Sequence, residues 1–157
     1  MSAPNLSQPL ISTELAYAEN ASGSLTGVAG TSTAIGTPVD VPNCSISVPP
    51  SNRPVYIEGA ISWVQNALGT GRVQLLIVET TGAATTIDSW GRVLPNSTST
   101  RGNTDNNYVR ARIGPTTQTR TFKLQARVDS VNTTVPSINV INSNLAGGKS
   151  YILAEAK

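Results

Sequence analysis

Three carboxylates on predicted strands, Glu58, Glu79 and Asp88, could in principle do acid–base chemistry. A glycosidase uses two such groups about 5 to 9 Å apart across a cleft. Nothing in their spacing along the chain requires any two of them to meet, and Glu58 and Glu79 fall on the solvent side or at the end of their strands. We interpret them as surface charges and predict that the chain is not an enzyme.

The sequence contains no histidine and a single cysteine, Cys44. Nucleophilic devices that pair serine or cysteine with histidine are therefore excluded, as are zinc sites that use histidine. One cysteine cannot form an internal disulfide or a cysteine cluster. We expect Cys44 to be a small buried hydrophobic residue, in a fold held by packing and hydrogen bonds.

Two short segments resemble parts of ligand-binding motifs, but neither has the remaining residues of the motif at the required spacing. Asp105-Asn106-Asn107 resembles part of a calcium loop, but the glycine and the terminal glutamate of an EF-hand do not follow where they are needed. The segment 69–72 lacks the Gly-Lys-Ser/Thr ending of a phosphate-binding loop. The sequence therefore predicts no bound metal and no cofactor.

Basic residues gather in one third of the chain, between residues 101 and 129. Nucleic-acid binding is not favoured, because Tyr108 and Phe122 are the only aromatic residues in this stretch. We predict instead that Arg110, Arg112 and Arg127 pair with carboxylates of a neighbouring copy. A plain solvated face is the alternative.

The two parts of the chain differ in charge. Residues 1–52 contain three acidic residues and no basic one, so residues 53–157 carry all 11 basic residues against the other 9 − 3 = 6 acidic ones, which gives −3 and +5. This asymmetry suggests electrostatic complementarity between copies or neighbours, and an evenly mixed folded surface is the alternative.

The composition indicates one β-rich domain. The chain has 157 residues, of which 38% are hydrophobic and 13% charged, together with 13 Gly and 10 Pro. No run approaches the roughly 18 apolar residues of a membrane helix, so we expect no membrane contact. The first basic residue is Arg53, so the start of a secretory signal is missing and we expect synthesis in the cytoplasm.

The first thirteen residues read as an extended arm. They contain two prolines and no charge, so residues 1–13 are expected to be neither a helix nor a domain. Leu6, Leu10 and Ile11 are apolar residues that a partner could bury. We therefore predict a docking arm over 1–13, followed by a β-sandwich domain over 14–157.

Short stretches with strand-like alternation follow at intervals of about ten residues, separated by Gly- and Pro-rich turns. In the strand expected over 54–64, Trp63 lies on the core face, and the run Leu75 to Val78 indicates a strand covered on both sides. Residues 21–36 are expected to be a long loop or a weak hairpin, and residues 95–107 an exposed loop. Eight to ten strands at this spacing predict an antiparallel sandwich or barrel; they are expected at 14–20, 44–48, 54–64, 72–79, 85–90, 108–113 and 120–129, around 138–140, and at 151–154.

The segments ELAYAEN (14–20) and VDVPNCSISVPPSNRPVYIEGAISW (39–63) resemble a group of small minor tail or virion-surface proteins of tailed bacteriophages, particularly phages of actinobacteria. RTFKLQARVDS (120–130) and SYILAEAK (150–157) look like the last two core strands of that group. The resemblance implies an all-β, jelly-roll-like antiparallel sandwich, usually trimeric, on the outside of a virion. This chain departs from the group in having only a short arm where many relatives carry long fibre segments.

The leading hypothesis is a structural phage protein at the tail or its tip, which self-associates as a trimer and docks on other virion proteins by its arm. Capsid decoration, with the major capsid protein as partner, is the alternative within the same class. A carbohydrate-binding module for a host surface glycan is the hypothesis from another class; it would use Trp90, Tyr108 and the polar segment 95–107.

Overall fold

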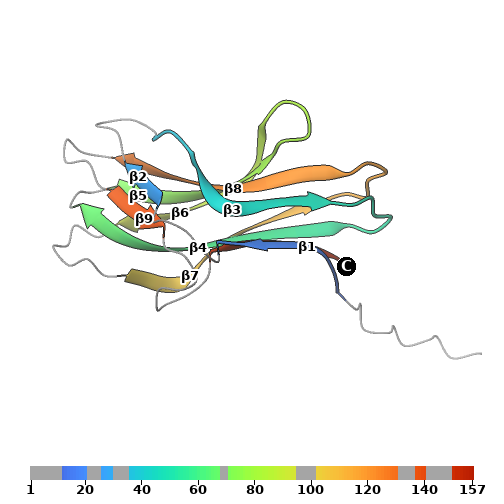
Figure 1. The fold of residues 1–157 in the computed structure, drawn as a ribbon, viewed down its shortest axis with the longest axis horizontal. Coiled ribbons are helices and arrows are strands. Elements are labelled where there is room, and N and C mark those ends of the chain that lie inside the picture. Colours follow the sequence, from blue (N-terminus) through green and yellow to red (C-terminus); the bar gives the residue numbers. More distant parts are fainter. Residues whose placement is uncertain are drawn as a thin grey trace, which may run out of the picture.

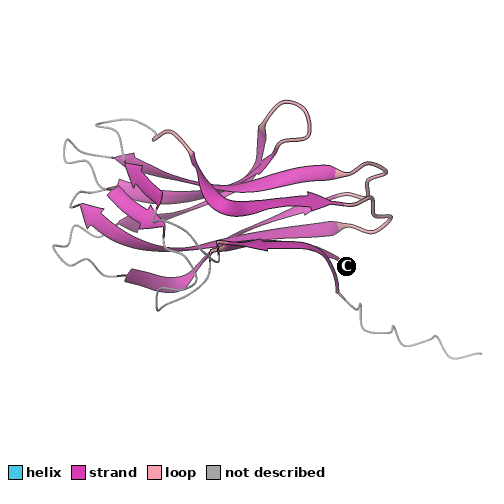
Figure 2. Cartoon of the chain, in the orientation of Figure 1, coloured by secondary structure: helices cyan, strands magenta, loops and turns pink. Residues whose placement is uncertain are grey.

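The computed structural model describes residues 12–20, 26–29, 36–67, 71–94, 102–130, 137–140 and 150–157. Strands make up most of this part of the chain, and it contains no helix (Figure 2). The strands are β1 (Thr13–Glu19), β2 (Thr26–Ala29), β3 (Val39–Val48), β4 (Val55–Ala67), β5 (Gly71–Glu79), β6 (Thr85–Leu94), β7 (Gly102–Ile113), β8 (Arg120–Ser130), β9 (Ser137–Val140) and β10 (Tyr151–Ala156).

Two antiparallel sheets face each other (Figure 1). One has the order β3-β8-β5-β6, and the other the order β1-β10-β4-β9-β2 with β7 on the opposite side of β4. Residues 55–60 of β4 pair with β10, and its later residues 63–67 pair with β9. β1 and β2 together thus occupy the position of one long, interrupted strand. β9 and β10 together occupy the position of another.

The resulting eight-strand order, β1-β10-β4-β7 against β3-β8-β5-β6, is that of a jelly roll. The predicted all-β, jelly-roll-like antiparallel sandwich is therefore confirmed. Where the interrupted strands break, Ser150 closes the ladder: its carbonyl accepts a 2.9 Å hydrogen bond from the amide of Asn20, and its hydroxyl accepts one of 3.1 Å from the amide of Ser62. Backbone groups at the interruption thus keep partners.

The core forms between the sheets because the strands alternate apolar and polar residues with a period of two. The predicted inward face of β4 is confirmed, and Ile57 and Trp63 are among the largest fully buried side chains. Phe122 and Leu124 on β8 are likewise buried, as predicted. Cys44 is also buried, with 1% of its surface exposed, which confirms its reading as a small core residue.

The run Leu75 to Val78 on β5 is buried along its whole length, as predicted. Leu75 and Ile77 belong to the core between the sheets. Leu76 and Val78 lie on the outer face, directly opposite Gln125 and Lys123 of β8, whose long stems can cover them. The facing sheet and the side chains of β8 thus cover both sides of β5 within one chain, and no subunit contact is needed for its burial.

One predicted boundary is wrong. The expected loop 95–107 overlaps β7, which begins at Gly102. The cause is β4, which continues to Ala67 and offers a ladder to its neighbour, so that Trp63 pairs with Asn103 and Val64 with Gly102. Backbone hydrogen bonds form along such a ladder whatever the side chains are. A strand made of polar residues therefore cannot be recognised from its side-chain pattern.

Other strands are also longer than alternation alone indicates. β3 begins at Val39, well before the expected start at Cys44. Its register is irregular between Asp40 and Ser45, and Asn43 there has a positive φ of 60°. This break in the alternation hides the first half of the strand from a periodicity test. The stretch 21–36, expected to be a long loop or a weak hairpin, includes the four-residue strand β2, which pairs with β9.

Gly59 provides a test of how closely the two sheets pack. A Cβ atom at this position would lie 2.5 Å from Cδ1 of Leu124 in the core. We expect Gly59→Ala to lower the free energy of unfolding by about 1–3 kcal/mol, because the core cannot accept the methyl group without moving a side chain. In the Leu124→Val background the loss should be smaller. A double-mutant cycle by urea unfolding measures this coupling, and strictly additive effects would contradict the packing described.

Candidate interaction surface

The outer face of the sheet β1-β10-β4-β7 holds every tyrosine of the chain. The sequence contains four, and the outward side of these four strands carries all of them, so we call it the tyrosine face. Alternation explains the placement: on β10, for example, Ile152 and Ala154 are buried, and the residues between them point outward. The four are Tyr17, Tyr56, Tyr108 and Tyr151.

Strand register sets the order of side chains across this face. Each of three rows crosses the sheet from β1 through β10 and β4 to β7, with directly paired residues as neighbours. The rows are Glu19, Tyr151, Ala60, Tyr108; then Tyr17, Leu153, Glu58, Arg110; and then Glu14, Glu155, Tyr56, Arg112.

Hydrogen bonds and ring stacking hold two of the tyrosines in place. The rings of Tyr17 and Tyr151 stack with centroids 6.1 Å apart. The Tyr151 hydroxyl donates a 2.6 Å hydrogen bond to Oε1 of Glu58, and the Tyr17 hydroxyl donates to Oε2 of Glu19. Burial, followed by the bond to Glu19, raises the pKa of Tyr17 to about 12. Burial, followed by the bond to Glu58, also raises the pKa of Tyr151 above its ordinary value. Both phenols therefore stay neutral donors near neutral pH.

Charge divides the tyrosine face into two halves. The carboxylates lie on β1, β10 and β4, whereas the two arginines lie on β7. β1 and β7 are three strand spacings apart, about 14 Å, which exceeds a Debye length of about 8 to 10 Å in physiological salt. Glu14 and Glu19 on β1 therefore do little to neutralise the arginines within one molecule, whereas Glu58 lies directly beside Arg110 in the ladder. The acidic half consists of Glu14, Glu19, Glu58 and Glu155, and the basic half of Arg110 and Arg112.

The arginines of β7 remain available to a partner. Both are exposed, and within the part of the chain that the structure describes no carboxylate forms an ion pair with either Arg110 or Arg112. The guanidinium of Arg110 lies over the ring of Tyr56, 4.8 Å from its centroid. One cation lies at the border of the acidic half: Lys157, with Nζ 3.9 Å from Glu155 and 5.4 Å from the centre of the Tyr56 ring.

Several charged residues on the opposite sheet, by contrast, are paired within the described part of the chain. Arg120 makes a bidentate pair with Glu79, with bonds of 2.7 and 2.6 Å. On the outer face, Lys123 lies 2.9 Å from Asp40. This last contact joins the acidic beginning of the chain to its basic remainder inside one molecule.

The structure separates the three arginines that were predicted to share an interface. Arg110 and Arg112 lie on β7, but Arg127 lies on β8 in the other sheet. There the Arg127 side chain donates a 2.7 Å hydrogen bond to Gln74 and lies 3.3 Å from Asp129, so it has carboxylate and amide partners of its own. The three cannot form one patch, because strands of different sheets face opposite ways.

The two predicted glycan contacts also lie in different sheets. Tyr108 is on β7, with 52% of its surface exposed. Trp90 is on β6, where it pairs with Leu75 of β5. The predicted docking residues Leu6, Leu10 and Ile11 lie outside the described residues, as does the segment 95–101, so the structure adds nothing on them.

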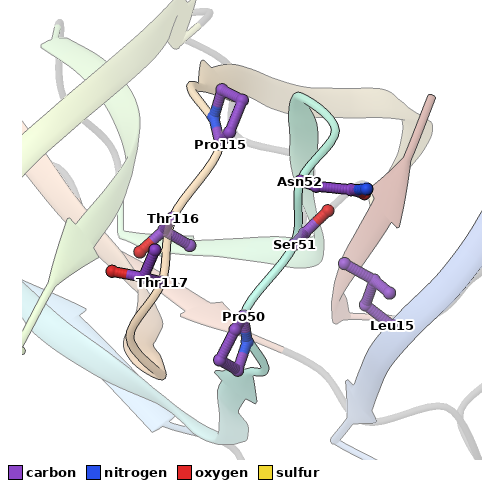
Figure 3. Close-up of a pocket in the computed structure, with 7 residues that line it drawn as sticks. All are labelled: Leu15, Pro50, Ser51, Asn52, Pro115, Thr116 and Thr117. Atoms are coloured by element: carbon purple, nitrogen blue, oxygen red, sulfur yellow. The ribbon is translucent and has the colours of Figure 1, made fainter.

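A groove of about 780 Å³ opens at the end of the sandwich where β1 begins (Figure 3). The β3–β4 turn and the β7–β8 turn form its walls and are joined by a bridge between Ser51 and Thr116, with 2.9 Å hydrogen bonds in both directions. The described lining contains no ionisable side chain, so the groove offers van der Waals contact and hydroxyl groups, not acid–base chemistry. Its residues are Leu15, Pro50, Ser51, Asn52, Pro115, Thr116 and Thr117.

The described residues contain neither a cluster of metal-binding side chains nor a membrane-spanning helix. They contain no group of three or more His, Cys, Asp or Glu side chains that could hold a metal ion. None of their elements is a helix long and apolar enough to cross a membrane.

Sequence reasoning singled out Tyr108, Arg110 and Arg112 on this face but missed Tyr17 and Tyr151. A signal for them was present. In each of the four strands the tyrosine falls on the polar side of the alternation, so each strand places one ring on its outward side. The tyrosines form one surface only if their strands share a sheet. The alternation within a strand does not show which strands share a sheet.

No protein-family model matches the sequence, and no curated protein matches it. Among solved structures it is similar to Eiger TNF from S. frugiperda, with 12% identity over 92% of each chain and a TM-score of 0.49. It is also similar to an infectious bursal disease virus Gt strain structure, with 12% identity over 100% of this chain and 42% of that one and a TM-score of 0.46. A VP2 subviral particle of the same virus shows 14% identity over 99% of this chain and 41% of that one, with a TM-score of 0.41.

The Arg120–Glu79 pair predicts how stability depends on acid. The hydrogen bond from Arg120 lowers the pKa of Glu79 from its ordinary 4.5, against the opposing effect of burial. A lowered folded-state pKa means that the contribution is fully present above pH 4.5 and is lost as the pH falls below it. We expect Glu79→Gln to be less stable than the wild type at neutral pH and to lose less stability on acidification. Urea unfolding across this range measures it, with Glu14→Gln as control, and parallel losses in wild type and Glu79→Gln would contradict the assignment.

Proposed function

We propose that this chain is a non-enzymatic structural protein of a tailed-phage virion, a minor tail or tail-tip component that binds copies of itself and docks by residues 1–13. The observation that carries the proposal is the tyrosine face. It combines exposed tyrosines with arginines that lack a carboxylate partner within the described residues, and tyrosine and arginine are the residue types most enriched where proteins bind each other.

Rigidity of the face supports binding. Tyr17 and Tyr151 are already held by stacking and by carboxylate hydrogen bonds, so ordering them against a partner costs little further entropy. The sheet edges add a second reason for association. β1 and β7 are edge strands of their sheet, as β3 and β6 are of the other, and self-association is one way to cover exposed edges.

Capsid decoration is the alternative within the same proposal, since a head protein and a tail protein could use the same face. Copy number distinguishes the two: decoration requires many copies for each head, and a tip component needs few. Quantitative mass spectrometry of purified particles measures this ratio directly.

The anchoring role of the arm can be tested without disturbing the fold. Because β1 begins at Thr13, deletion of residues 1–11 leaves every described strand intact. We expect the truncated protein to keep the melting temperature and self-association of the full chain but to be missing from purified particles. Incorporation at the wild-type level would refute the anchoring role, and loss of folding would show that the arm belongs to the domain.

A carbohydrate-binding module is the second candidate, favoured by the exposed ring of Tyr108. Aromatic rings of this kind stack on sugars. If this candidate is correct, a glycan array should detect binding by the wild type that falls by up to about tenfold in Tyr108→Ala, the size expected for one lost ring contact. Trp90→Ala, in the other sheet, tests whether a second ring takes part. Ser47→Ala, on an exposed position of the other sheet, should bind like the wild type. Absence of any glycan signal, or a signal indifferent to both aromatic residues, would eliminate it.

A further inference from the structure

We infer that the partner of the tyrosine face is the tyrosine face of a second copy, related by a two-fold axis that runs parallel to the strands, in place of the trimer that the resemblance implies. This inference rests on the proposed self-association and specifies its geometry. It follows from the charge division of the face, from the order of its rows, and from the contrast with the opposite sheet.

The charge division selects the axis. Two faces pressed together by a two-fold axis parallel to the strands exchange left and right, so that β1 of one copy lies over β7 of the other. The β1 edge of each acidic half, which carries Glu14, then meets the arginines of its partner's β7, and the contact occurs twice, as in any isologous interface. An axis perpendicular to the strands would place β1 over β1 and bring like charges together, which is unfavourable.

The same axis keeps each row opposite itself. In the row that begins with Glu14, this carboxylate comes opposite Arg112 of the second copy. In the next row, Tyr17 comes opposite Arg110, and an arginine over a tyrosine ring is a favourable contact. Arg110 already lies over Tyr56 in the single chain, so its guanidinium is held flat against the face rather than projecting from it.

The partner is a second copy because both halves of the charge pattern belong to one face. A uniformly acidic partner would oppose Glu14 and Glu155, and a uniformly basic one would oppose Arg110 and Arg112. The partner must therefore present a surface that is acidic on one side and basic on the other and that is as wide as the tyrosine face. The chain itself carries such a surface.

The opposite sheet is a poorer candidate for the same contact. Its outward charges find partners within the chain, as in the pairs of Lys123 with Asp40 and of Arg127 with Asp129. Its apolar outward residues Leu76 and Val78 are only 4% exposed. By contrast, Tyr17 and Tyr108, at 44% and 52%, are the exposed large hydrophobic residues of the described chain, and both lie on the tyrosine face.

A charge-swap experiment tests this arrangement. Variant A, Arg110→Glu with Arg112→Glu, makes the whole face acidic; variant B, Glu14→Lys with Glu155→Lys, gives its acidic edge positive charge. All four side chains lie on the outer side of their strands, and circular dichroism verifies folding. We expect each variant alone to self-associate at least about tenfold more weakly than the wild type, and an equimolar mixture to form a heterodimer of near wild-type affinity. Sedimentation velocity over a concentration series measures all three.

Matched controls separate this geometry from a general effect of charge. Ser47→Glu with Thr86→Glu adds two negative charges to exposed positions of the opposite sheet and should dimerise like the wild type. Arg110→Gln with Arg112→Gln removes the basic half without reversing it, and should weaken dimerisation less than variant A. Added salt should weaken the wild-type dimer, because the contacts at its rim are ionic.

The outcomes distinguish this inference from the proposed function. A self-associating wild type with unaffected variants A and B, or with no heterodimer in the mixture, overturns the face-to-face pair and leaves self-association standing. A wild type that sediments as a trimer overturns the two-fold axis. A wild type that stays monomeric at every concentration overturns the inference and the proposed self-association together, and a glycan bound by that monomer would favour the second candidate.

Discussion

The register of β4 is the constraint on which both the core and the surface depend. β4 pairs with β10 and β9 on one side and with β7 on the other, so its alternation is imposed on the middle of the sheet. Its inward residues, such as Ile57, lie in the core, while Tyr56 and Glu58 lie on the tyrosine face. A slip of one residue would exchange the two sets, burying a carboxylate and exposing the core. The same alternation therefore stabilises the fold and composes the surface.

The two outer faces of the sandwich differ in how their charged side chains are paired. On the sheet β3-β8-β5-β6, ion pairs such as Lys123 with Asp40 close within the chain. On the tyrosine face, the carboxylates of β1 lie across the width of the sheet from the arginines of β7, and phenols are fixed by neighbours such as Glu58. A face whose charges are satisfied internally gains little from a partner, because binding must replace contacts already made. A face with separated charges and rigid rings gains more.

Several features could be predicted from the sequence because they follow from local patterns. The period-two alternation around Phe122 identifies β8 and its buried side, and the apolar run Leu75 to Val78 identifies a strand with two covered faces. The start of β7 could not be predicted in this way, since its polar residues are recruited by pairing with the end of β4. For a related reason, the sequence does not show that Arg127 and Arg110 lie in different sheets: similar strands can belong to opposite sheets, and neighbours in the chain can be separated in space.

The sequence by itself determined the all-β class, most of the strand positions, the burial of Cys44 and the exclusion of histidine-based chemistry, because composition and alternation act within a few residues. Only the tertiary structure decided which strands share a sheet. Pairing joins Tyr17 to residues more than a hundred positions away and sets Glu14 and Arg112 at the two sides of one face. The cause is that sheet order is fixed by long-range backbone hydrogen bonds and by the packing of one sheet on the other, and neither is written in the period of any single strand.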